Sequence, residues 1–314
     1  MRWQFRRTDD GAGGRLQALR RGVKFWWRCW RNAAALRLST SVFHDSALDS
    51  IVDIEPAMPL RPLRSYLRRG LSSRTRARAL QSHFAWLSQN MPPEQIDQLY
   101  LGGPSVLVGD GSVVPGLGIL LSRAAHLGRE GELALHLEWQ GTRVMSLAFS
   151  VLNAELVVAS GEPLELRGLR AVVGSLQGAR GADDALRELS TACERLRPSA
   201  LLITALQGLS VAWSLRAPLC VAAESHVYAG YASRRRRVGI DYDAAWRDGG
   251  GERMARHYWL LPETPRLRPD SEVESRRRAQ HRRRNALRTG LCAAVRVSAG
   301  RLLRAEPQRQ SVVR

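Results

Sequence analysis

The sequence predicts an α+β fold in which a mixed, largely antiparallel β-sheet is flanked by helices. Residues 131–139 and 142–151 alternate apolar and polar side chains on either side of Gln140-Gly141, which is typical of a β-hairpin. Between residues 171 and 224, short apolar strand-like runs alternate with helical segments, which indicates a mixed sheet with helices packed on it. Residues 74–90 carry apolar side chains at helical spacing, so a helical part precedes the sheet.

The other elements follow from turn residues and apolar runs. Pro92-Pro93 ends the first helix, and a short second helix over 94–100 precedes a glycine-rich turn. Strand patterns begin near Val106, and a further strand over 155–159 follows the hairpin. The αβ half is predicted as a strand over 171–176, a helix from Asp183 to about Leu196, a strand over 201–204, a helix over 206–215 and a strand over 219–222.

Composition divides the chain into four segments. A basic and aromatic segment covers 1–60, a helical part covers 61–130, an α+β core covers 131–262, and an arginine-rich helix and tail cover 263–314. The net charge of +19 lies in the flanks, because residues 1–90 carry +11, residues 91–230 carry −4 and residues 231–314 carry +12. Lys24 is the only lysine among 48 basic residues, so arginine enrichment reflects genome composition as much as ligand chemistry.

Neither a disulfide framework nor a metal site is predicted. The four cysteines, Cys29, Cys193, Cys220 and Cys292, are far apart and form no C-x-x-C pair. The seven histidines form no H-x-x-x-H or H-E-x-x-H pattern. We expect reduced thiols that pack as small apolar groups in a cytoplasmic protein.

Two apolar stretches bear on membrane insertion. The uncharged run over 198–215 touches the lower length limit for a membrane span, but its polar content favours a buried strand plus helix. Near the N-terminus, Asp9 and Asp10 are acidic, and Arg28 and Arg31 interrupt the other apolar stretch, which argues against a signal peptide. We therefore expect a cytoplasmic protein that is peripheral at the inner membrane.

Two basic stretches are candidate contacts with an anionic membrane surface. Residues 20–31, as a short helix, would place a Phe and Trp cluster among lipid headgroups while arginines meet anionic lipid. The alternative is that these aromatics dock the segment on the protein itself. Residues 276–284 belong to a helix predicted over 270–287 with arginines around most of its circumference, which is typical of an exposed arm. Nucleic acid is less favoured, because no zinc finger, RNP-like strand or helix-turn-helix pattern is present.

The turn that follows the strand over 171–176 is the candidate cofactor-binding feature. The helix after this turn carries Asp183 and Asp184 in its first turn. Backbone N–H groups and the positive end of a helix dipole converge at such a turn, which suits a pyrophosphate. The six residues of the turn are Gln177, Gly178, Ala179, Arg180, Gly181 and Ala182.

Several short motifs occur in a fixed order over roughly residues 60–290. They are Gly131-Glu132-Leu133, Ser146 to Phe149, Gly174-Ser175-Leu176-Gln177-Gly178, Arg197-Pro198, Val227-Tyr228, Asp241-Tyr242-Asp243 with Trp246, Gly249-Gly250, Leu261-Pro262 and Ser275-Arg276-Arg277-Arg278-Ala279. In these motifs the sequence resembles the VirK/YbjX family of Gram-negative bacterial proteins. The resemblance implies a link to virulence and to survival of cationic antimicrobial peptides at the envelope. The arginine-only tail departs from the mixed lysine and arginine usual in that family.

The order of elements also resembles the GNAT acyltransferase fold, in which the turn after the central strand holds the pyrophosphate of acetyl-CoA or another acyl-CoA. The GNAT pattern is Gln/Arg-x-x-Gly-x-Gly/Ala, and Gln177 and Ala182 match it. Arg180 stands where glycine is expected, and Gly181 comes one place late. The Arg180 side chain would either obstruct the turn or pair with a phosphate.

Acyl transfer to an amine or peptide acceptor needs a base, a donor for the oxyanion and an acid for the thiolate. Glu138 and Glu224 are the candidate bases, and both are equally compatible with ordinary surface carboxylates. The tyrosine that serves as acid in GNAT enzymes is missing from residues 206–215. Tyr228, which lies beyond that segment, is the candidate substitute.

A polar and aromatic cluster after the last αβ strand is the candidate substrate-binding region, because ligands lie beyond the strand ends of open sheets. The alternative is that its aspartates cap turns and pair with Arg234 to Arg237. The cluster consists of His226, Asp241, Tyr242, Asp243 and Trp246.

Two functions therefore follow from the sequence, a GNAT-like N-acyltransferase and a non-catalytic module that binds anionic surfaces.

Overall fold

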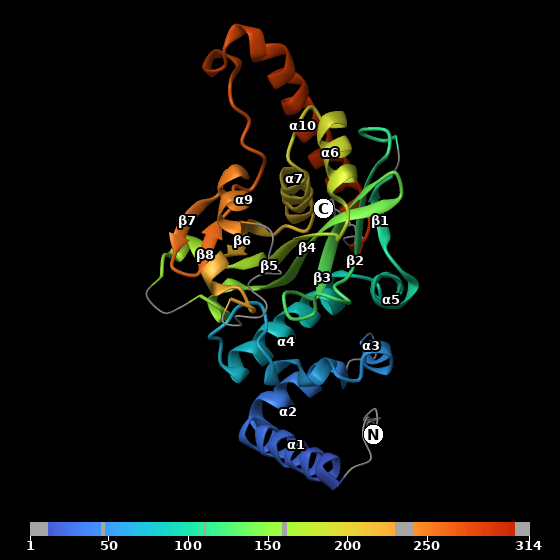
Figure 1. The fold of residues 1–314 in the computed structure, drawn as a ribbon, viewed down its shortest axis with the longest axis vertical. Helices are drawn as coiled ribbons and strands as arrows, with labels where there is room; N and C mark the ends of the chain where they lie inside the picture. Colours follow the sequence, from blue (N-terminus) through green and yellow to red (C-terminus); the bar gives the residue numbers. More distant parts are fainter. Residues whose placement is uncertain (1–11, 45–47, 110, 159–161, 230–240, 305–314) are drawn as a thin grey trace, which may run out of the picture.

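An eight-stranded sheet forms the centre of the computed structural model, which describes residues 12–44, 48–109, 111–158, 162–229 and 241–304. The strand order is β1-β2-β3-β4-β5-β6-β8-β7, and β5 and β6 are parallel while the other neighbours are antiparallel (Figure 1). The predicted α+β class with a mixed, largely antiparallel sheet is confirmed. The strands are β1 (Ser105–Val108), β2 (Leu117–Arg123), β3 (Leu133–Trp139), β4 (Thr142–Asn153), β5 (Leu169–Gly178), β6 (Arg216–Val221), β7 (Glu252–Ala255) and β8 (Tyr258–Leu260).

Helices lie before, within and after the strand sequence, as the sequence predicts. The sheet itself begins at Ser105, so β1 and β2 lie in the 61–130 segment, and β2 pairs with β3 of the 131–262 core. The α-helices are α1 (Ala12–Arg31), α2 (Ala33–Ser41), α3 (Asp49–Ile54), α4 (Ser73–Asn90), α5 (Pro93–Asp97), α6 (Asp183–Ala192), α7 (Pro198–Ala212), α9 (Tyr242–Asp248) and α10 (Arg278–Gly300).

The predicted β-hairpin is present as β3 and β4. Gln140 and Gly141 join the strands with φ of 50° and 76°, so both occupy the left-handed region that a tight hairpin turn requires. The pairing starts in the register that this turn dictates, with Trp139 opposite Thr142. A bulge between Leu137 and Glu138 then shifts the register by one residue, so His136 lies opposite Ser146.

The strand predicted over 201–204 is wrong, because these residues belong to α7, a single helix from Pro198 to Ala212. Proline is favoured in the first turn of a helix, and here it begins one. The helix is buried almost all round, so its sequence has no amphipathic periodicity that would separate it from a buried strand. At Gly208 an added β-carbon would lie 2.6 Å from the Cys292 carbonyl oxygen, so glycine permits α7 and α10 to pack closely.

Two other predicted elements differ in position. Residues 154–156 form a short 3-10 helix instead of the start of a strand over 155–159, and residue 159 lies outside the described residues. The basic helix begins at Arg278 instead of Asp270 and continues to Gly300. Residues 270–272 and 275–277 form separate 3-10 turns before it. The helix continues because its second half turns apolar side chains, including Leu291 and Val295, into the core.

The two faces of the sheet differ in character. Helices α7 and α10 cover one face, where Phe149 of β4 packs against Trp213 at the end of α7. The opposite face carries small and polar side chains such as Ala134, Ala148 and Ser146. The loop from Ala124 to Gly131 lies on this second face, where Ala124 and Leu127 pack against the two strand alanines. The sheet therefore has one core face and one face that is open to ligands beyond that loop.

Strands β5 and β6 pair along only part of their length. Their parallel register covers Arg170 to Val173 of β5, and pairing ends before Gly174. Beyond that point Tyr242 of α9 contacts β5, since it takes a backbone hydrogen bond from Leu176. The carboxyl end of β5, including the turn after it, is consequently not covered by β6.

Candidate functional site

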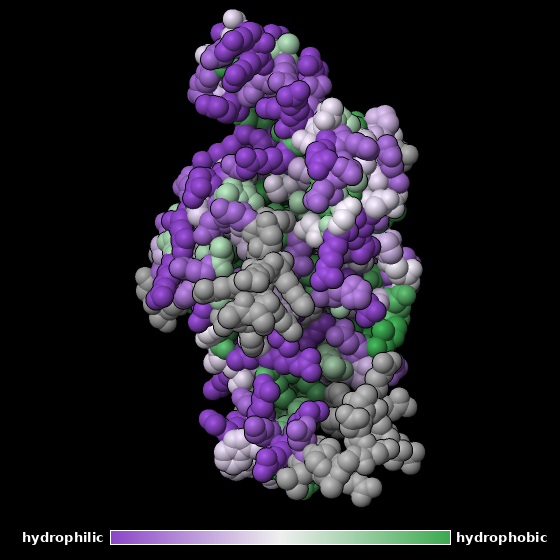
Figure 2. Space-filling view, viewed as in Figure 1, coloured by the Kyte–Doolittle hydropathy of each residue, from purple (hydrophilic) through white to green (hydrophobic). Residues whose placement is uncertain are grey.

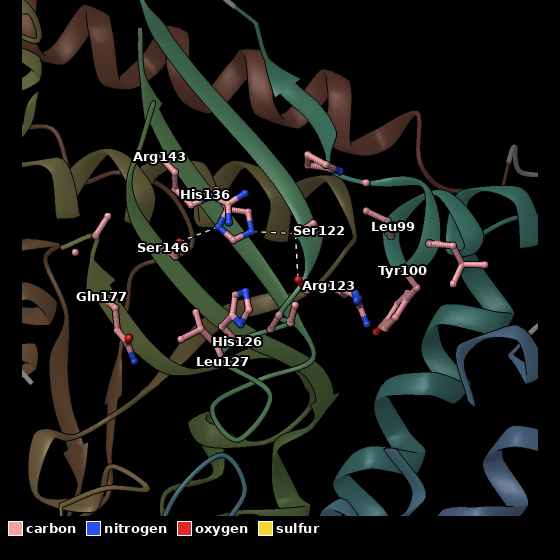
Figure 3. Close-up of a pocket in the computed structure, with 17 residues that line it drawn as sticks. Leu99, Tyr100, Ser122, Arg123, His126, Leu127, His136, Arg143, Ser146 and Gln177 are labelled. Carbon is pink, nitrogen blue, oxygen red and sulfur yellow. Dashed lines mark hydrogen bonds between the residues drawn. The ribbon is translucent and has the colours of Figure 1, made fainter. Parts of the chain in front are cut away.

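A pocket of about 450 Å³ opens on the polar face of the sheet, across β2, β3, β4 and the end of β5 (Figure 3). Its floor is the sheet itself, and its walls are the η3 segment (Gln98–Gly102) and the loop after β2. The described residues that line it include two arginines and two histidines but no aspartate or glutamate. The lining residues are Leu99, Tyr100, Leu101, Gly103, Pro104, Ser122, Arg123, Ala124, Ala125, His126, Leu127, His136, Arg143, Ser146, Gln177, Gly178 and Ala179.

Three side chains on adjacent strands form a hydrogen-bonded row in the floor of this pocket. Ser122 Oγ of β2 lies 2.9 Å from His136 Nε2 of β3, and His136 Nδ1 lies 2.8 Å from Ser146 Oγ of β4. Figure 3 shows His136 between the two serines, with Ser122 also bonded to the backbone of Arg123. Both imidazole nitrogens are thus engaged by hydroxyl groups.

The imidazole of His136 is neutral at neutral pH. Burial and, to a smaller extent, the nearby positive charge of Arg143 together lower the pKa of His136 to about 4. A neutral imidazole carries one proton and one lone pair, so it donates to one serine and accepts from the other. The imidazole of His136 is therefore uncharged and has a lone pair that can accept a proton.

The row continues toward the rest of the molecule through β5. Gln177 lies opposite Ser146 in the β4–β5 register and lines the pocket. Its Nε2 donates to Glu130 Oε1 at 2.8 Å, and the same Glu130 oxygen lies 3.3 Å from His226 Nε2. Glu130 and His226 are both buried. The polar chain therefore connects the floor of the pocket to the residues that follow β6.

The predicted cofactor turn lies at the rim of the pocket. Gln177, Gly178 and Ala179 line the pocket, and the chain then turns at Arg180 and Gly181 into α6. Gly181 has φ of 72°, and a β-carbon at Gly178 or Gly181 would meet no atom within 4 Å. The N–H of Ala179 is already used, because it donates to the Val144 carbonyl at 2.9 Å. The open backbone of the turn begins after Ala179.

The predicted catalytic and substrate-binding residues are only partly brought together. Glu224, His226, Tyr228 and Tyr242 line a smaller pocket of about 260 Å³ beyond the end of β6. Glu224 is 56% exposed there and pairs with Arg253 at 2.9 Å. Glu138 lies apart from them on β3, half-buried opposite Arg143, and lines neither pocket.

The remaining three residues of the predicted substrate cluster have structural positions. Asp241 caps α9 by accepting from the Ala244 N–H at 3.1 Å. Asp243 accepts from the Ala223 N–H and from Trp259 Nε1, and it pairs with Arg253. Trp246 is buried and donates to the Val221 carbonyl. Arg234 to Arg237, the predicted partners of the aspartates, lie outside the described residues.

The sequence did not single out the Ser122, His136 and Ser146 row. In the sequence, His136 is one of the polar residues of an alternating strand, together with Glu132 and Glu138, which gives no reason to choose it. An unbroken hairpin register from the Gln140-Gly141 turn would place His136 opposite Met145. Only the bulge brings Ser146 across from it. One signal could have identified the row. His136 belongs to the polar face of its strand, and both neighbouring strands carry a serine, Ser122 and Ser146.

Comparison with known proteins gives the family of the chain. The model of a family described as a protein of unknown function (DUF535) matches residues 14–296, which is most of the sequence. The chain belongs to the DUF535 family. This agrees with the VirK/YbjX resemblance, since an uncharacterised protein named YbjX from Escherichia coli K12 is 25% identical over 280 residues, covering 83% of this chain and 81% of that protein.

A second relative matches a shorter part of the chain. An uncharacterised protein of Haemophilus influenzae is 25% identical over 189 residues, covering 59% of this chain and 58% of that protein. No solved structure matches the chain. Within this DUF535 chain, two motif glycines have a structural reason: a β-carbon at Gly131 would meet the Phe149 backbone, and one at Gly174 would meet the Glu130 carbonyl.

Proposed function

We propose that this protein is an N-acyltransferase with a GNAT-like core, which takes an acyl group from acyl-CoA or acetyl-CoA and passes it to an amine or peptide acceptor. The observation that carries the proposal is the position of the β5 exit. Gln177, Gly178 and Ala179 line the pocket on the polar face of the sheet and lead without a break into the turn before α6. One ligand can therefore have its reacting group in the pocket and its phosphates at the turn.

The electrostatics of the pocket support an anionic donor. Arg123 and Arg143 line it, and the described lining residues include no aspartate or glutamate. Outside the pocket, Arg123 also pairs with Glu55 at 3.8 Å, and Arg143 lies opposite Glu138. Coenzyme A carries several phosphate charges, which arginines bind as charge-assisted hydrogen bonds. The middle of the chain carries a net charge of −4, so this local positive site is not a consequence of the overall charge.

The turn itself fits a phosphate group in its backbone. Open space in front of Gly178 and Gly181 leaves room for close approach of an oxygen to the main chain. Asp183 and Asp184 occupy the first turn of α6, and Asp184 pairs with Arg187. Because these carboxylates would repel a phosphate on the helix axis, we place the phosphate at residues 180–182 instead.

The same pocket supplies a base. His136 is neutral at neutral pH and hydrogen-bonded in the pocket floor, so its imidazole accepts a proton during transfer. Glu138 does not line the pocket, and Glu224 and Tyr228 lie in the smaller pocket beyond β6. We therefore assign the proton-accepting role to His136 and leave Glu224, Tyr228, His226 and Tyr242 as a neighbouring acceptor-side region.

Calorimetric titration tests this function. Wild-type protein is titrated with acetyl-CoA and with a long-chain acyl-CoA, beside Gly178→Trp. Residue 178 lines the pocket, and a β-carbon there would meet no atom within 4 Å. Gly290→Trp, at an equally open glycine of α10, is the matched control. We expect binding by wild type and control and at least about tenfold weaker binding by Gly178→Trp. Binding of no CoA species by the wild type would refute the proposal.

A second candidate function is favoured by one separate observation, the exposed face of α1. Leu19, Val23, Trp26 and Trp30 are 66%, 60%, 67% and 61% exposed and follow the spacing of a single helical stripe. Basic residues flank the stripe, and α1 has no acid in its first turn. We propose that this face binds an anionic membrane surface, consistent with the envelope and antimicrobial-peptide link that the family resemblance implies.

Each of the two interpretations of residues 20–31, docking on the protein and exposure toward a membrane, applies to a different side of α1. Phe25 lines pockets on the protein body, and Arg28 donates to the Leu63 carbonyl, so one side of α1 is docked. The Trp26 and Trp30 side faces solvent. No helix within the described ranges is long and apolar enough to cross a membrane.

The other basic stretch, 276–284, is a weaker candidate for membrane contact. It lies at the opposite end of the molecule from α1 (Figure 1). Figure 2 shows hydrophilic residues over this outer end of α10. Several of its arginines bind back to the protein, with Arg282 pairing with Asp270 and Arg283 with Glu194. These contacts use arginine charge that a membrane would otherwise receive.

A further inference from the structure

We propose that Ser146 is a nucleophile that carries the acyl group as a covalent ester between donor and acceptor. The inference rests on the proposed function for the identity of the donor, and it adds an acyl-enzyme intermediate to that function. It depends on which atom of the Ser122, His136 and Ser146 row holds each proton.

The proton positions follow from one backbone carbonyl. Ser122 Oγ lies 3.0 Å from the carbonyl oxygen of Arg123, and a carbonyl oxygen can only accept a hydrogen bond. The Ser122 proton therefore points to Arg123, and Ser122 Oγ must accept from His136 Nε2. In this way a main-chain group fixes the imidazole tautomer with its proton on Nε2.

The consequence for Ser146 is an activated hydroxyl group. With the only imidazole proton on Nε2, the lone pair of Nδ1 faces Ser146 Oγ at 2.8 Å and accepts its hydrogen. Ser146 is half-buried and lines the pocket, whereas His136 is 5% exposed beneath it. Nucleophile, base and orienting group thus stand in one row, the arrangement by which a serine becomes reactive.

The reaction balances with the groups present. Ser146 Oγ attacks the thioester carbonyl carbon, its proton moves to His136 Nδ1, and the C–S bond breaks after the C–O bond forms. His136 returns the proton to the leaving thiolate, so CoA departs as a thiol. A neutral amine then attacks the ester carbonyl and forms an amide. His136 takes the excess proton of that amine and delivers it to Ser146 Oγ as the C–O bond breaks.

Gln177 is placed to assist the charge that develops on the carbonyl oxygen. It lies directly opposite Ser146 across the β4–β5 pair and lines the same pocket. Its amide group has two N–H donors, of which one binds Glu130. The other donor is assigned to the oxyanion, where such a group acts because it is held in place before the reaction.

Ser122 acts through His136 and is a positioning residue. Its loss removes the acceptor that holds the proton on Nε2, so the tautomer with a proton on Nδ1 becomes available and Ser146 loses its base. If the Ser122, His136 and Ser146 row had only a structural role, either tautomer of His136 would maintain its hydrogen bonds. The two cases are therefore separable by the reactivity of Ser146.

The test uses a fluorophosphonate probe and intact-protein mass spectrometry on the full chain. We expect one adduct on the wild type, located at Ser146 by peptide mapping and absent from Ser146→Ala. Ser210→Ala is the control, because Ser210 is a buried serine outside the pocket whose Oγ makes no hydrogen bond in the structure. His136→Gln should slow labelling by about 10²-fold or more, and Ser122→Ala should slow it while leaving Ser146 labelled.

The dependence of the labelling rate on acid pH distinguishes a base from a purely structural His136. Because the pKa of His136 lies at about 4, the labelling rate should stay constant on lowering the pH to about 5 and fall below it. With an acyl-CoA, the expected intermediate is an ester on Ser146 that neutral hydroxylamine releases. Labelling that persists in Ser146→Ala, or is absent from the wild type, overturns the inference.

The outcomes separate the two proposals. If acyl-CoA binds in calorimetry but Ser146 neither reacts with the probe nor carries an ester, the covalent route is refuted and the transferase proposal stands. If Ser146 reacts with the probe but no CoA species binds, the nucleophile stands and the CoA donor is refuted.

Discussion

The carbonyl oxygen of Glu130 lies directly over Gly174, in a position that leaves no room for a β-carbon on β5. This contact holds the loop from Ala124 to Gly131 onto the polar face of the sheet. Glu130 in turn binds Gln177 of the pocket and lies beside His226. One glycine on a central strand thus sets where the pocket wall and the polar chain behind it can stand.

Gly174→Ala should destabilise the fold and displace that loop. The methyl group would collide with backbone, which cannot move aside as a flexible side chain does, so we expect a loss of about 3 kcal/mol in the free energy of unfolding. Urea unfolding measures it. Gly178→Ala, on the same strand but with open space before it, should change stability by less than about 1 kcal/mol. Equal effects of the two variants would contradict the assignment.

The pH dependence of stability should contain a component from Glu132. Burial raises the pKa of Glu132 from 4.5 to about 7, against the opposing effect of Arg61. A raised carboxyl pKa means that the folded state holds its proton more tightly. Stability is therefore greatest below pH 4.5 for this group and is lost as pH rises through 7.

Glu132→Gln should remove that component, which is on the order of 2 to 3 kcal/mol between pH 4.5 and pH 8. Urea unfolding at pH 5 and pH 8 checks it in the variant and the wild type. Glu55→Gln is the control, because Glu55 is the more exposed of the two carboxylates bound to Arg61. An unchanged slope in Glu132→Gln would show that this carboxyl group is ionised throughout.

His83 should produce the opposite dependence in a partly overlapping range. Burial lowers the pKa of His83 from 6.5 to about 3, and its Nδ1 accepts from the Val151 N–H. The stability that this neutral imidazole provides is complete above pH 6.5 and is lost as pH falls toward 3. The loss is at most about 1.4 kcal/mol per pH unit for one such group.

The His83 contribution can be isolated by substitution. His83→Gln should flatten the decline of unfolding free energy between pH 6.5 and pH 4, whereas His44→Gln, at an exposed position, should leave it unchanged. Because Glu132 acts in the opposite direction between pH 4.5 and 6.5, the comparison is made in a Glu132→Gln background. A decline of the same size with and without His83 would refute the assignment.

The membrane proposal predicts a lipid-selective effect of the α1 stripe. Replacing Trp26 and Trp30 together with serine should weaken binding to phosphatidylglycerol vesicles by about tenfold or more, since two exposed aromatic side chains no longer enter the interface. Vesicle co-sedimentation measures it, with phosphatidylcholine vesicles as the uncharged comparison. Val297→Ser, at a 57% exposed apolar residue of α10, is the control.

DNA binding distinguishes this proposal from unspecific charge attraction. If vesicles and DNA bind equally, both fade with salt and neither depends on Trp26 and Trp30, the basic flank acts only as a positive surface. That result would contradict a specific membrane role for α1.

Much of the fold could be predicted because its signals are local. Gln140-Gly141 specifies a two-residue hairpin turn, and Pro92-Pro93 marks where α4 ends, so both features occur where the sequence places them. The sequence predicts a strand over 201–204 instead of a helix, because a helix that is buried on all sides lacks the periodic spacing of apolar residues that identifies an amphipathic helix. Its identity is decided by its packing between α10 and the sheet, which is a long-range property.

The candidate site was predictable only at its rim. The turn from Gln177 to Ala182 has a local pattern, and the structure places its first half in the wall of the pocket. The floor depends on a bulge that changes the partner of His136, and on which face of the sheet the helices leave open. Neither property is encoded within a few residues, so His136 and Ser146 carried no recognisable motif.

The last helix of the chain has a consequence for how the protein is made. The end of α10 binds back to the end of α4, where Arg304 donates to the carbonyls of Asn90 and Met91, more than 200 residues earlier. Until α10 has left the ribosome, β1 and the side of α7 that packs on α10 lack that cover. A nascent chain that has not yet reached α10 should therefore expose this apolar surface, and chaperone binding to it should end once α10 is released.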